Sequence, residues 1–233
     1  MSTAPLREAV IDLVAVRENI ARVAAGAGRP VAVDVGRDAH GHGLVPVASV
    51  AVEAGAGVLI VADAAERALL AEAGIRAAVV VDAVVADPLA RAAYGVALPG
   101  LVPAMSLRAG VVSVKRVAPG QGVSYGLTYR TPASSTLVLV PLGYADGVPR
   151  AAGPRAGVLL RGRRHRVAGR IAMDQFVLDV GDAPVELGDT VTVFGPGTDG
   201  EPTAADWAEW AGAAPDDIVA GIGRRVARRY RDA

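Results

Sequence analysis

The chain contains no cysteine among its 233 residues and only one lysine, Lys115, against 23 arginines. The absence of cysteine excludes disulfide bonds, thiolate zinc ligands and cysteine nucleophiles. A Schiff base forms only with a primary amine, which a guanidinium group does not offer. Lys115 and the amino terminus are therefore the only groups that could hold an aldehyde cofactor covalently.

The chain also lacks net charge and long hydrophobic runs. Its 24 basic side chains balance 24 acidic ones, so no global field attracts nucleic acid or an anionic membrane. No apolar run reaches 18 residues without a charge, and the opening segment MSTAPLREAVID lacks the pattern of a signal peptide. We predict a cytoplasmic protein that binds neither nucleic acid nor a membrane.

Strands and helices alternate in the first half of the sequence. Strands are predicted at 8–14, 30–35, 58–62 and 77–82, and helices at 15–26, at 44–54 and from Asp63 to Gly74. This alternation with Val-rich strands favours a parallel sheet covered by helices. His40 and His42 flank Gly41 in the loop 36–43, but they lack a third ligand nearby, so no metal site is predicted.

From Leu107 onward the pattern becomes all-β. Strands are predicted at 107–117, 135–142, 157–162, 165–180 and 189–195, separated by Gly, Pro and Asp turns. One helix interrupts them, with Thr203 and Asp206 as a capping box and two tryptophans on one face. We therefore predict two domains, an α/β domain at 1–106 and a β-domain at 107–233.

Three blocks in the second half carry the signal for function: VSYGLTYRTP from Val123, VPLGYADGVPR from Val140 and GRIAMDQFVLDV from Gly169. They resemble the carboxy-terminal β-domain of alanine racemases, a family of pyridoxal-phosphate enzymes with a (β/α)8 barrel in front of this domain. The resemblance implies that Tyr125 is a catalytic base. It also places further residues at the substrate site or its entrance: Tyr144, Asp146, Arg150, Arg170, Met173 and Asp174.

The barrel that the resemblance implies does not fit into the first half. A full barrel takes about 250 residues, and only 122 precede Val123. The expected fold is therefore a truncated (β/α)8-like half followed by the β-domain. In the family two chains pair head to tail, each β-domain completing the site of the other chain. We expect a homodimer of this kind that binds a small molecule.

The cofactor positions of the family are altered. Alanine racemases carry a lysine before a DAYGHG-like loop, and this chain reads VAVDVGRDAHGHGL from Val31, which puts Gly36 at the lysine position and His40 at the tyrosine position. In the last barrel strand the family has an arginine against the pyridine nitrogen of the cofactor, and aligning on Gly95, taken as a cofactor-binding position, puts Ala93 there. Arg224 aligns with a tyrosine that touches the cofactor phosphate. The resemblance implies pyridoxal phosphate, but without the lysine we expect no cofactor.

These observations leave three hypotheses for function. The first is a repurposed, cofactor-independent acid/base enzyme acting on a small molecule, with Tyr125 and His40 as catalytic groups and a closed apolar pocket around Tyr125. The second is an authentic pyridoxal-phosphate-dependent alanine racemase or amino-acid isomerase. The third is a non-catalytic partner that lends Tyr125 to a full-length racemase. The first is the main prediction.

Overall fold

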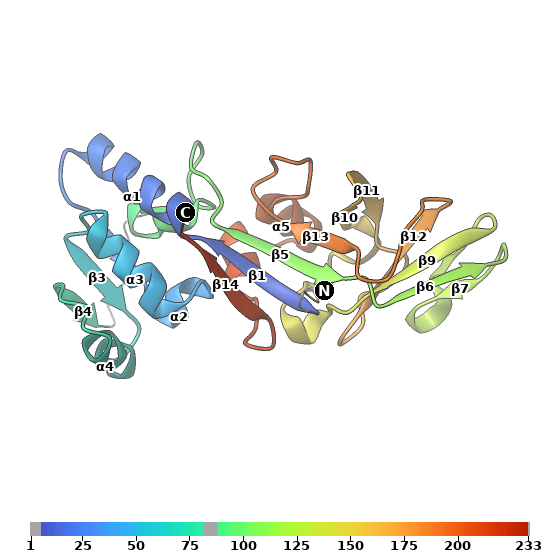
Figure 1. The fold of residues 1–233 in the computed structure, drawn as a ribbon, viewed down its shortest axis with the longest axis horizontal. Coiled ribbons are helices and arrows are strands. Elements are labelled where there is room, and N and C mark those ends of the chain that lie inside the picture. Colours follow the sequence, from blue (N-terminus) through green and yellow to red (C-terminus); the bar gives the residue numbers. More distant parts are fainter. Residues whose placement is uncertain (1–5, 82–87, 233) are drawn as a thin grey trace. The chain divides into compact units, whose positions relative to one another are not determined.

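The structure is a computed structural model that describes residues 6–81 and 88–232 (Figure 1). The chain forms two compact units. Of the described residues, the α/β unit comprises 10–81, 88–105 and 228–232, and the β-rich unit comprises 106–227 and 6–9. The strands β1 (Arg7–Asp12), β5 (Met105–Gly110) and β14 (Ala227–Arg231) contribute residues to both. A domain boundary after residue 106 stays a prediction.

The α/β unit follows the predicted alternation. A parallel sheet has the order β2-β3-β4, in a register that places Val33 beside Leu59 and Leu59 beside Val79. Its elements are α1 (Leu13–Ala27), β2 (Ala32–Asp34), α2 (Gly36–His40), α3 (Leu44–Glu53), β3 (Val58–Val61), α4 (Ala64–Glu72), β4 (Val79–Val81) and η1 (Pro88–Tyr94). Residue 82, the predicted end of the last strand, lies outside the described residues.

Local side-chain chemistry explains where the helices start. The Asp12 carboxylate accepts from the Ala15 amide at 3.1 Å at the start of α1, and Asp63 accepts from the Glu66 amide at 2.8 Å at the start of α4. These bonds satisfy amides that have no partner within the helix. The apolar face of α1, with Val16 and Ile20, is buried, and α1 packs against α3 and η1.

One segment of the α/β unit differs from its prediction. The segment that resembles the last barrel strand begins at Arg91, and its first residues, 91–94, lie in the 3₁₀ helix η1 instead of a strand. The sequence PLARAAY contains no β-branched residue, so it lacks the side chains that favour an extended backbone. The helix ends at Tyr94, whose hydroxyl donates to the carbonyl oxygen of Asp34 at 2.5 Å and ties η1 to β2.

The short segment α2 is left-handed, where the sequence predicted only a loop. Its residues Arg37, Asp38, Ala39 and His40 all have φ between 51° and 57°. Each non-glycine residue in this region costs about 1–2 kcal/mol. Two carboxylates hold the turn: Asp38 accepts from the Leu44 amide at 2.8 Å, and Glu66 accepts from the Asp38 amide at 2.8 Å.

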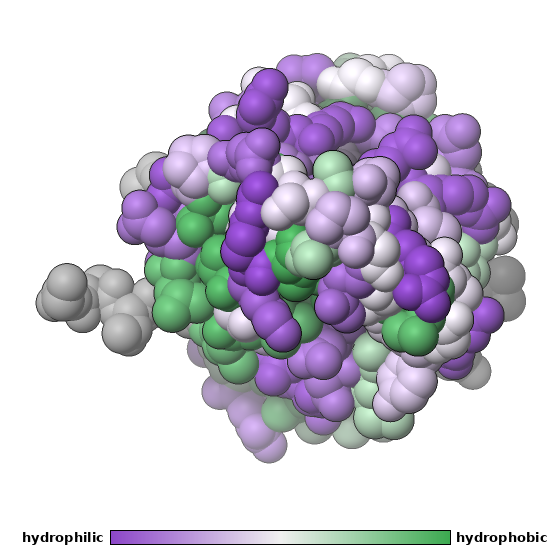
Figure 2. All heavy atoms as spheres, turned by 90° about the vertical axis from the view of Figure 1, so that its right-hand side faces the viewer, coloured by the Kyte–Doolittle hydropathy of each residue, from purple (hydrophilic) through white to green (hydrophobic). Residues whose placement is uncertain are grey.

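The β-rich unit contains the predicted strands and helix. Its elements are β5, β6 (Ser113–Val117), β7 (Gly122–Val123), η2 (Tyr125–Leu127), β8 (Tyr129–Arg130), β9 (Ser135–Val140), η3 (Tyr144–Asp146), η4 (Gly153–Arg155), β10 (Gly157–Leu160), β11 (Arg163–Arg166), β12 (Phe176–Gly181), β13 (Thr190–Phe194), α5 (Ala204–Ala211) and α6 (Pro215–Ala220). The sheets have the orders β11-β10-β13-β5-β1-β14, β12-β9-β6 and β7-β8. Figure 2 shows that on one face of the molecule hydrophobic side chains gather in patches between strips of hydrophilic ones.

Two predicted strands are interrupted. The segment 107–117 breaks between β5 and β6, and 165–180 becomes β11 and β12 with a loop between them. Gly169 has a φ of 84° in this loop, which ends the extended backbone. The loop carries Met173 and Asp174, so the break exposes residues that a continuous strand would have paired.

The helix α5 buries one face in the core of the β-rich unit. The Thr203 hydroxyl and the Asp206 carboxylate form the predicted capping box, each accepting from the other residue's amide. Trp207 is fully buried and donates its indole N–H to the Val193 carbonyl at 2.7 Å. Its ring meets that of Trp210 edge-on at 5.7 Å. Among the described residues, no helix is long and apolar enough to cross a membrane.

Candidate functional site

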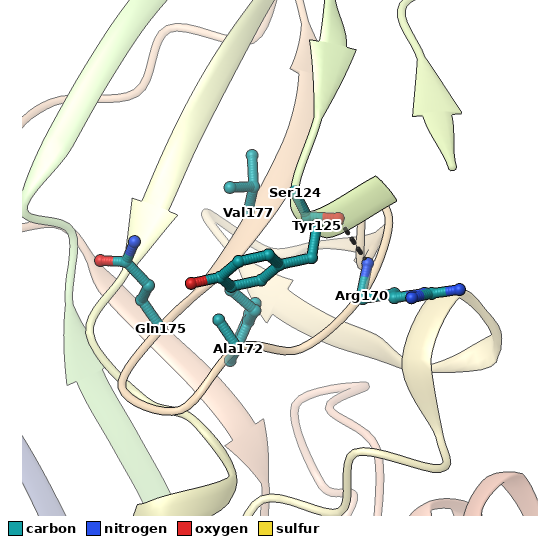
Figure 3. A pocket seen from close by; sticks show the side chains of 7 residues that line it. Ser124, Tyr125, Arg170, Ala172, Gln175 and Val177 are labelled. Carbon is teal, nitrogen blue, oxygen red and sulfur yellow. Dashed lines mark hydrogen bonds between the residues drawn. The ribbon is translucent and has the colours of Figure 1, made fainter. Parts of the chain in front are cut away.

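Tyr125 sits in a strained turn between β7 and β8. Ser124, directly before it, has φ 59° and ψ −177°, and Leu127 has φ 48°, which are both unusual for residues other than glycine. The Ser124 hydroxyl oxygen accepts a hydrogen bond from the Arg170 amide at 2.7 Å, drawn as a dashed line in Figure 3. Strained backbone of this kind persists where the surrounding contacts hold it, often at functional sites.

A glycine makes this contact possible. A Cβ atom at Gly169 would lie 2.3 Å from the Ser124 hydroxyl oxygen and 3.1 Å from the Val123 carbonyl oxygen. Any other residue at 169 would push the loop away from the Tyr125 turn. The turn and the loop 167–175 are therefore locked together by a close approach that only glycine allows.

The Tyr125 side chain is open to solvent, with 75% of its surface exposed. It borders two depressions of about 370 Å³ and about 540 Å³, which share Tyr125, Arg170, Ala172 and Gln175 in their walls. In Figure 3 the phenol hydroxyl points toward Gln175, on the side of the ring away from the Arg170 guanidinium. The closed apolar pocket predicted around Tyr125 is absent from the described residues.

The other predicted entrance residues lie around the larger depression, with one exception. Tyr144, Arg150, Met173 and Asp174 line it, and the Arg150 guanidinium lies over the Tyr144 ring at 5.7 Å. Asp146 does not line either depression and is fully buried. Sequence reasoning did not identify Ser124 or the arginines that pair with Asp146, because those contacts join residues far apart in the chain.

His40, the second predicted catalytic residue, lies in the α/β unit. Its Nε2 is 2.9 Å from the Asp34 carboxylate, and both side chains are largely buried. Burial alone would raise the pKa of Asp34, but the hydrogen bond and charge of His40 outweigh burial and hold that pKa below its usual value. The two side chains thus form a hydrogen-bonded pair inside the α/β unit.

Gly36, at the lysine position, leaves little room for a side chain. A Cβ atom there would lie 3.0 Å from the Ala62 amide nitrogen and 3.1 Å from the Asp34 carboxylate. The same carboxylate accepts from the Gly36 amide at 3.0 Å. Gly95 is confined more tightly, since a Cβ atom there would lie 1.9 Å from the Val102 carbonyl oxygen. Arg224 is exposed, in the stretch between α6 and β14.

Comparison with known proteins identifies both halves of the chain. Residues 104–230 match the family model of the alanine racemase C-terminal domain, and residues 11–102 match that of the N-terminal domain. The chain is 55% identical over 139 residues to an alanine racemase of Thermobifida fusca and 56% identical over 131 residues to one of Frankia casuarinae. These matches cover 60% and 56% of this chain but only 37% and 34% of those racemases.

Solved structures agree with this assignment. The alanine racemase of Streptomyces lavendulae, a producer of D-cycloserine, superposes with a TM-score of 0.91 at 29% identity, over 100% of this chain and 98% of that one. The alanine racemase of Streptomyces coelicolor superposes with a TM-score of 0.86 at 29% identity, over 97% of this chain and 98% of that one. The predicted fold, a barrel-like α/β half followed by a β-rich domain, is confirmed.

The main functional prediction, a repurposed cofactor-independent enzyme, is wrong. The relatives and structural neighbours are alanine racemases, and nothing in the described residues encloses Tyr125.

Alanine racemases depend on pyridoxal phosphate, and the residues present do not fit its covalent attachment. The one lysine lies in β6 of the β-rich unit, exposed to solvent. Gly36, which the resemblance places at the family's lysine position, is a glycine whose surroundings crowd an added side chain. With its two family models together spanning most of the sequence, the chain nevertheless belongs to the alanine racemase family.

Proposed function

We propose that this chain takes part in the interconversion of L- and D-alanine, with the Tyr125 hydroxyl as the group that exchanges the α-proton on one face of the amino acid. The match of residues 104–230 to the racemase C-terminal domain supports this most strongly. The open position of Tyr125 supports it too, because a group that serves a site completed by another chain must be accessible before that chain binds.

The residues around Tyr125 have complementary roles in this proposal. The Ser124 turn and its bond to the Arg170 amide orient the phenol. The guanidinium of Arg170 lines both depressions and supplies the positive charge that the carboxylate of alanine requires. Tyr144 and Arg150 border the larger depression, where they restrict which amino acids reach Tyr125.

The missing amine favours a second candidate role, in which the site is shared between different chains. In alanine racemases the lysine and the tyrosine at one site come from two chains, and this chain offers only the tyrosine. The lysine would then come from a full-length racemase rather than from a second copy of this chain. A homodimer, head to tail, remains the arrangement proposed if the chain acts alone.

The first experiment measures D-alanine formed from L-alanine by the purified chain in the presence of pyridoxal phosphate. If the chain acts alone, D-alanine accumulates, and Tyr125→Phe lowers kcat by about 10²–10⁴ because general acid/base catalysis contributes that much. Leu127→Ala, on the same exposed turn, is the control and should keep most of the activity.

A second experiment separates the two candidate roles. The chain is mixed with a full-length alanine racemase whose own catalytic tyrosine is changed to phenylalanine. Recovery of activity with this chain, and not with its Tyr125→Phe variant, identifies the shared site. If neither the chain alone nor the mixture forms D-alanine, the proposed function is rejected.

A further inference from the structure

We infer that Asp146 is a positioning residue, which fixes the loop Met173–Gln175 relative to Tyr125 without touching substrate. This inference rests on the proposed function, since it gives Asp146 a role in the same site. The contacts that carry it all lie within the β-rich unit. They form a path from a buried carboxylate to the wall of the larger depression.

The path begins at a fully buried carboxylate. The Arg7 guanidinium donates to Asp146 Oδ1 at 2.7 Å, and Arg225 Nε lies 3.4 Å from the same oxygen. The Gly143 amide donates to Oδ2 at 2.9 Å. A buried carboxylate is tolerated only when it is paired and hydrogen-bonded in this way. Asp146 therefore fixes the 3₁₀ turn η3 on which it lies.

The 3₁₀ turn η3 then holds the loop Met173–Gln175 in place. The Tyr144 amide donates to the Ala172 carbonyl at 3.1 Å, and the Ala145 amide donates to the Met173 carbonyl at 2.9 Å. Gly143 lies so close to this loop that a Cβ atom would be 2.3 Å from the Met173 carbonyl oxygen. The position of the loop backbone thus follows the position of η3.

A second link reaches the loop through a side chain. Arg225, which pairs with Asp146, donates from Nη2 to the Asp174 carboxylate at 2.5 Å. One guanidinium thus joins the buried carboxylate to a side chain that lines the larger depression. Tyr125 is anchored at the beginning of the loop rather than at Met173–Gln175, through the bond between the Ser124 hydroxyl and the Arg170 amide.

Asp146→Asn tests the inference. Both carboxylate oxygens accept hydrogen bonds, so an amide must place its NH2 group against one of the donors. Amide hydrogen exchange of Ala145, measured by NMR on the whole chain, should accelerate about tenfold. Asp182→Asn is the matched control, since Asp182 pairs only at the surface with Arg116, and it should leave this exchange unchanged. Acceleration of Ala145 by less than threefold in folded Asp146→Asn overturns the inference.

If Asp146→Asn does not fold, Arg225→Ala tests the inference instead. The Arg225 side chain is 45% exposed, and its loss leaves the Arg7–Asp146 pair in place. Exchange at Ala145 should then accelerate threefold or more, and a smaller change overturns the inference. Hydrogen exchange can be measured without enzymatic activity, so this test of the inference is independent of the proposed function.

Kinetics distinguish positioning from a general loss of folded protein. Where the racemisation assay gives activity, Asp146→Asn should raise KM for L-alanine about tenfold and leave kcat within threefold, because the loop lines the depression while Tyr125 stays in place. A fall in kcat with an unchanged KM is the signature of a smaller folded fraction and overturns the inference.

Discussion

The ring of His42 packs against the ring of Tyr94, with the two centroids 4.5 Å apart and the planes tilted by 33°. His42 is fully buried, and its Nδ1 donates to the carbonyl oxygens of Ala39 and His40 at 3.1 and 3.2 Å. Its Nε2 has no hydrogen-bond partner among the described residues. Burial lowers the pKa of His42 to about 3, so the ring is neutral in the folded protein.

This burial predicts a loss of stability in mild acid. Below about pH 6.5 the unfolded chain takes up a proton at His42, whereas the folded chain does so only below about pH 3. The free energy of unfolding should therefore fall as the pH drops through this window, with a contribution from His42 of about 1.4 kcal/mol per pH unit. Urea denaturation at a series of pH values measures it.

His42→Phe is the control for this pH dependence. The phenyl ring keeps the packing against Tyr94 and cannot be protonated. The variant should show a smaller slope between pH 4 and 6 than the wild-type chain. Equal slopes would contradict the assignment of the acid sensitivity to His42.

Ser124→Ala should destabilise the β-rich unit and loosen Tyr125. The substitution removes the acceptor of the exposed Arg170 amide but keeps the strained backbone, at a cost of about 0.5–1.5 kcal/mol in the free energy of unfolding. Chemical denaturation measures this cost. The control is Ser49→Ala, which removes only an exposed hydroxyl with a 3.4 Å contact and should change stability by less than half as much. A larger loss of stability in Ser49→Ala than in Ser124→Ala would argue against a stabilising bond between Ser124 and the Arg170 amide.

Two glycine substitutions should change stability in opposite directions. Gly36→Ala places a methyl group about 3 Å from the Ala62 amide and the Asp34 carboxylate, and overpacking of this kind costs about 1–3 kcal/mol. Gly26→Ala, inside α1 with no atom within 4 Å of the new methyl group, should stabilise by about 0.5–1 kcal/mol. Thermal unfolding of the two variants gives the sign of each change in stability. A stabilised Gly36→Ala would show that a methyl group can be accommodated at this position.

The two tryptophans of α5 should differ in importance. Trp207→Phe leaves the Val193 carbonyl without its 2.7 Å donor inside the core, so a loss of about 2–3 kcal/mol is expected. Trp210→Phe removes a partly exposed edge contact and should cost less than about 1 kcal/mol. Urea denaturation followed by far-UV circular dichroism compares them, and equal losses would contradict the role given to the indole hydrogen bond.

The parts of the fold that could be predicted are those set by neighbouring residues. The cap of Asp63 on the Glu66 amide lies within one turn, and the buried face of α1 follows from the spacing of Val16 and Ile20. Local chemistry of this kind can be read from a few consecutive residues. The same holds for the Thr203 capping box at the start of α5.

The parts that could not be predicted depend on distant residues. Arg7 and Asp146 are 139 positions apart, so no sequence pattern pairs them. The left-handed turn α2 consists of residues that rarely adopt positive φ, and one of the two carboxylates that hold it belongs to Glu66, 28 positions beyond Asp38. The position of Tyr125 could be predicted by resemblance, but its exposure could not, because exposure depends on how the loops fold around it.

The solitary amine on β6 makes this protein unusually simple to label. With the α-amine of the chain blocked, a succinimidyl dye applied at alkaline pH reacts with a single side chain, Lys115, which is exposed on the outer strand of the β12-β9-β6 sheet. Because the sequence has no native thiol, one introduced cysteine would accept a second, orthogonal fluorophore. Energy transfer between the two dyes could then report directly when another polypeptide covers the Tyr125 face.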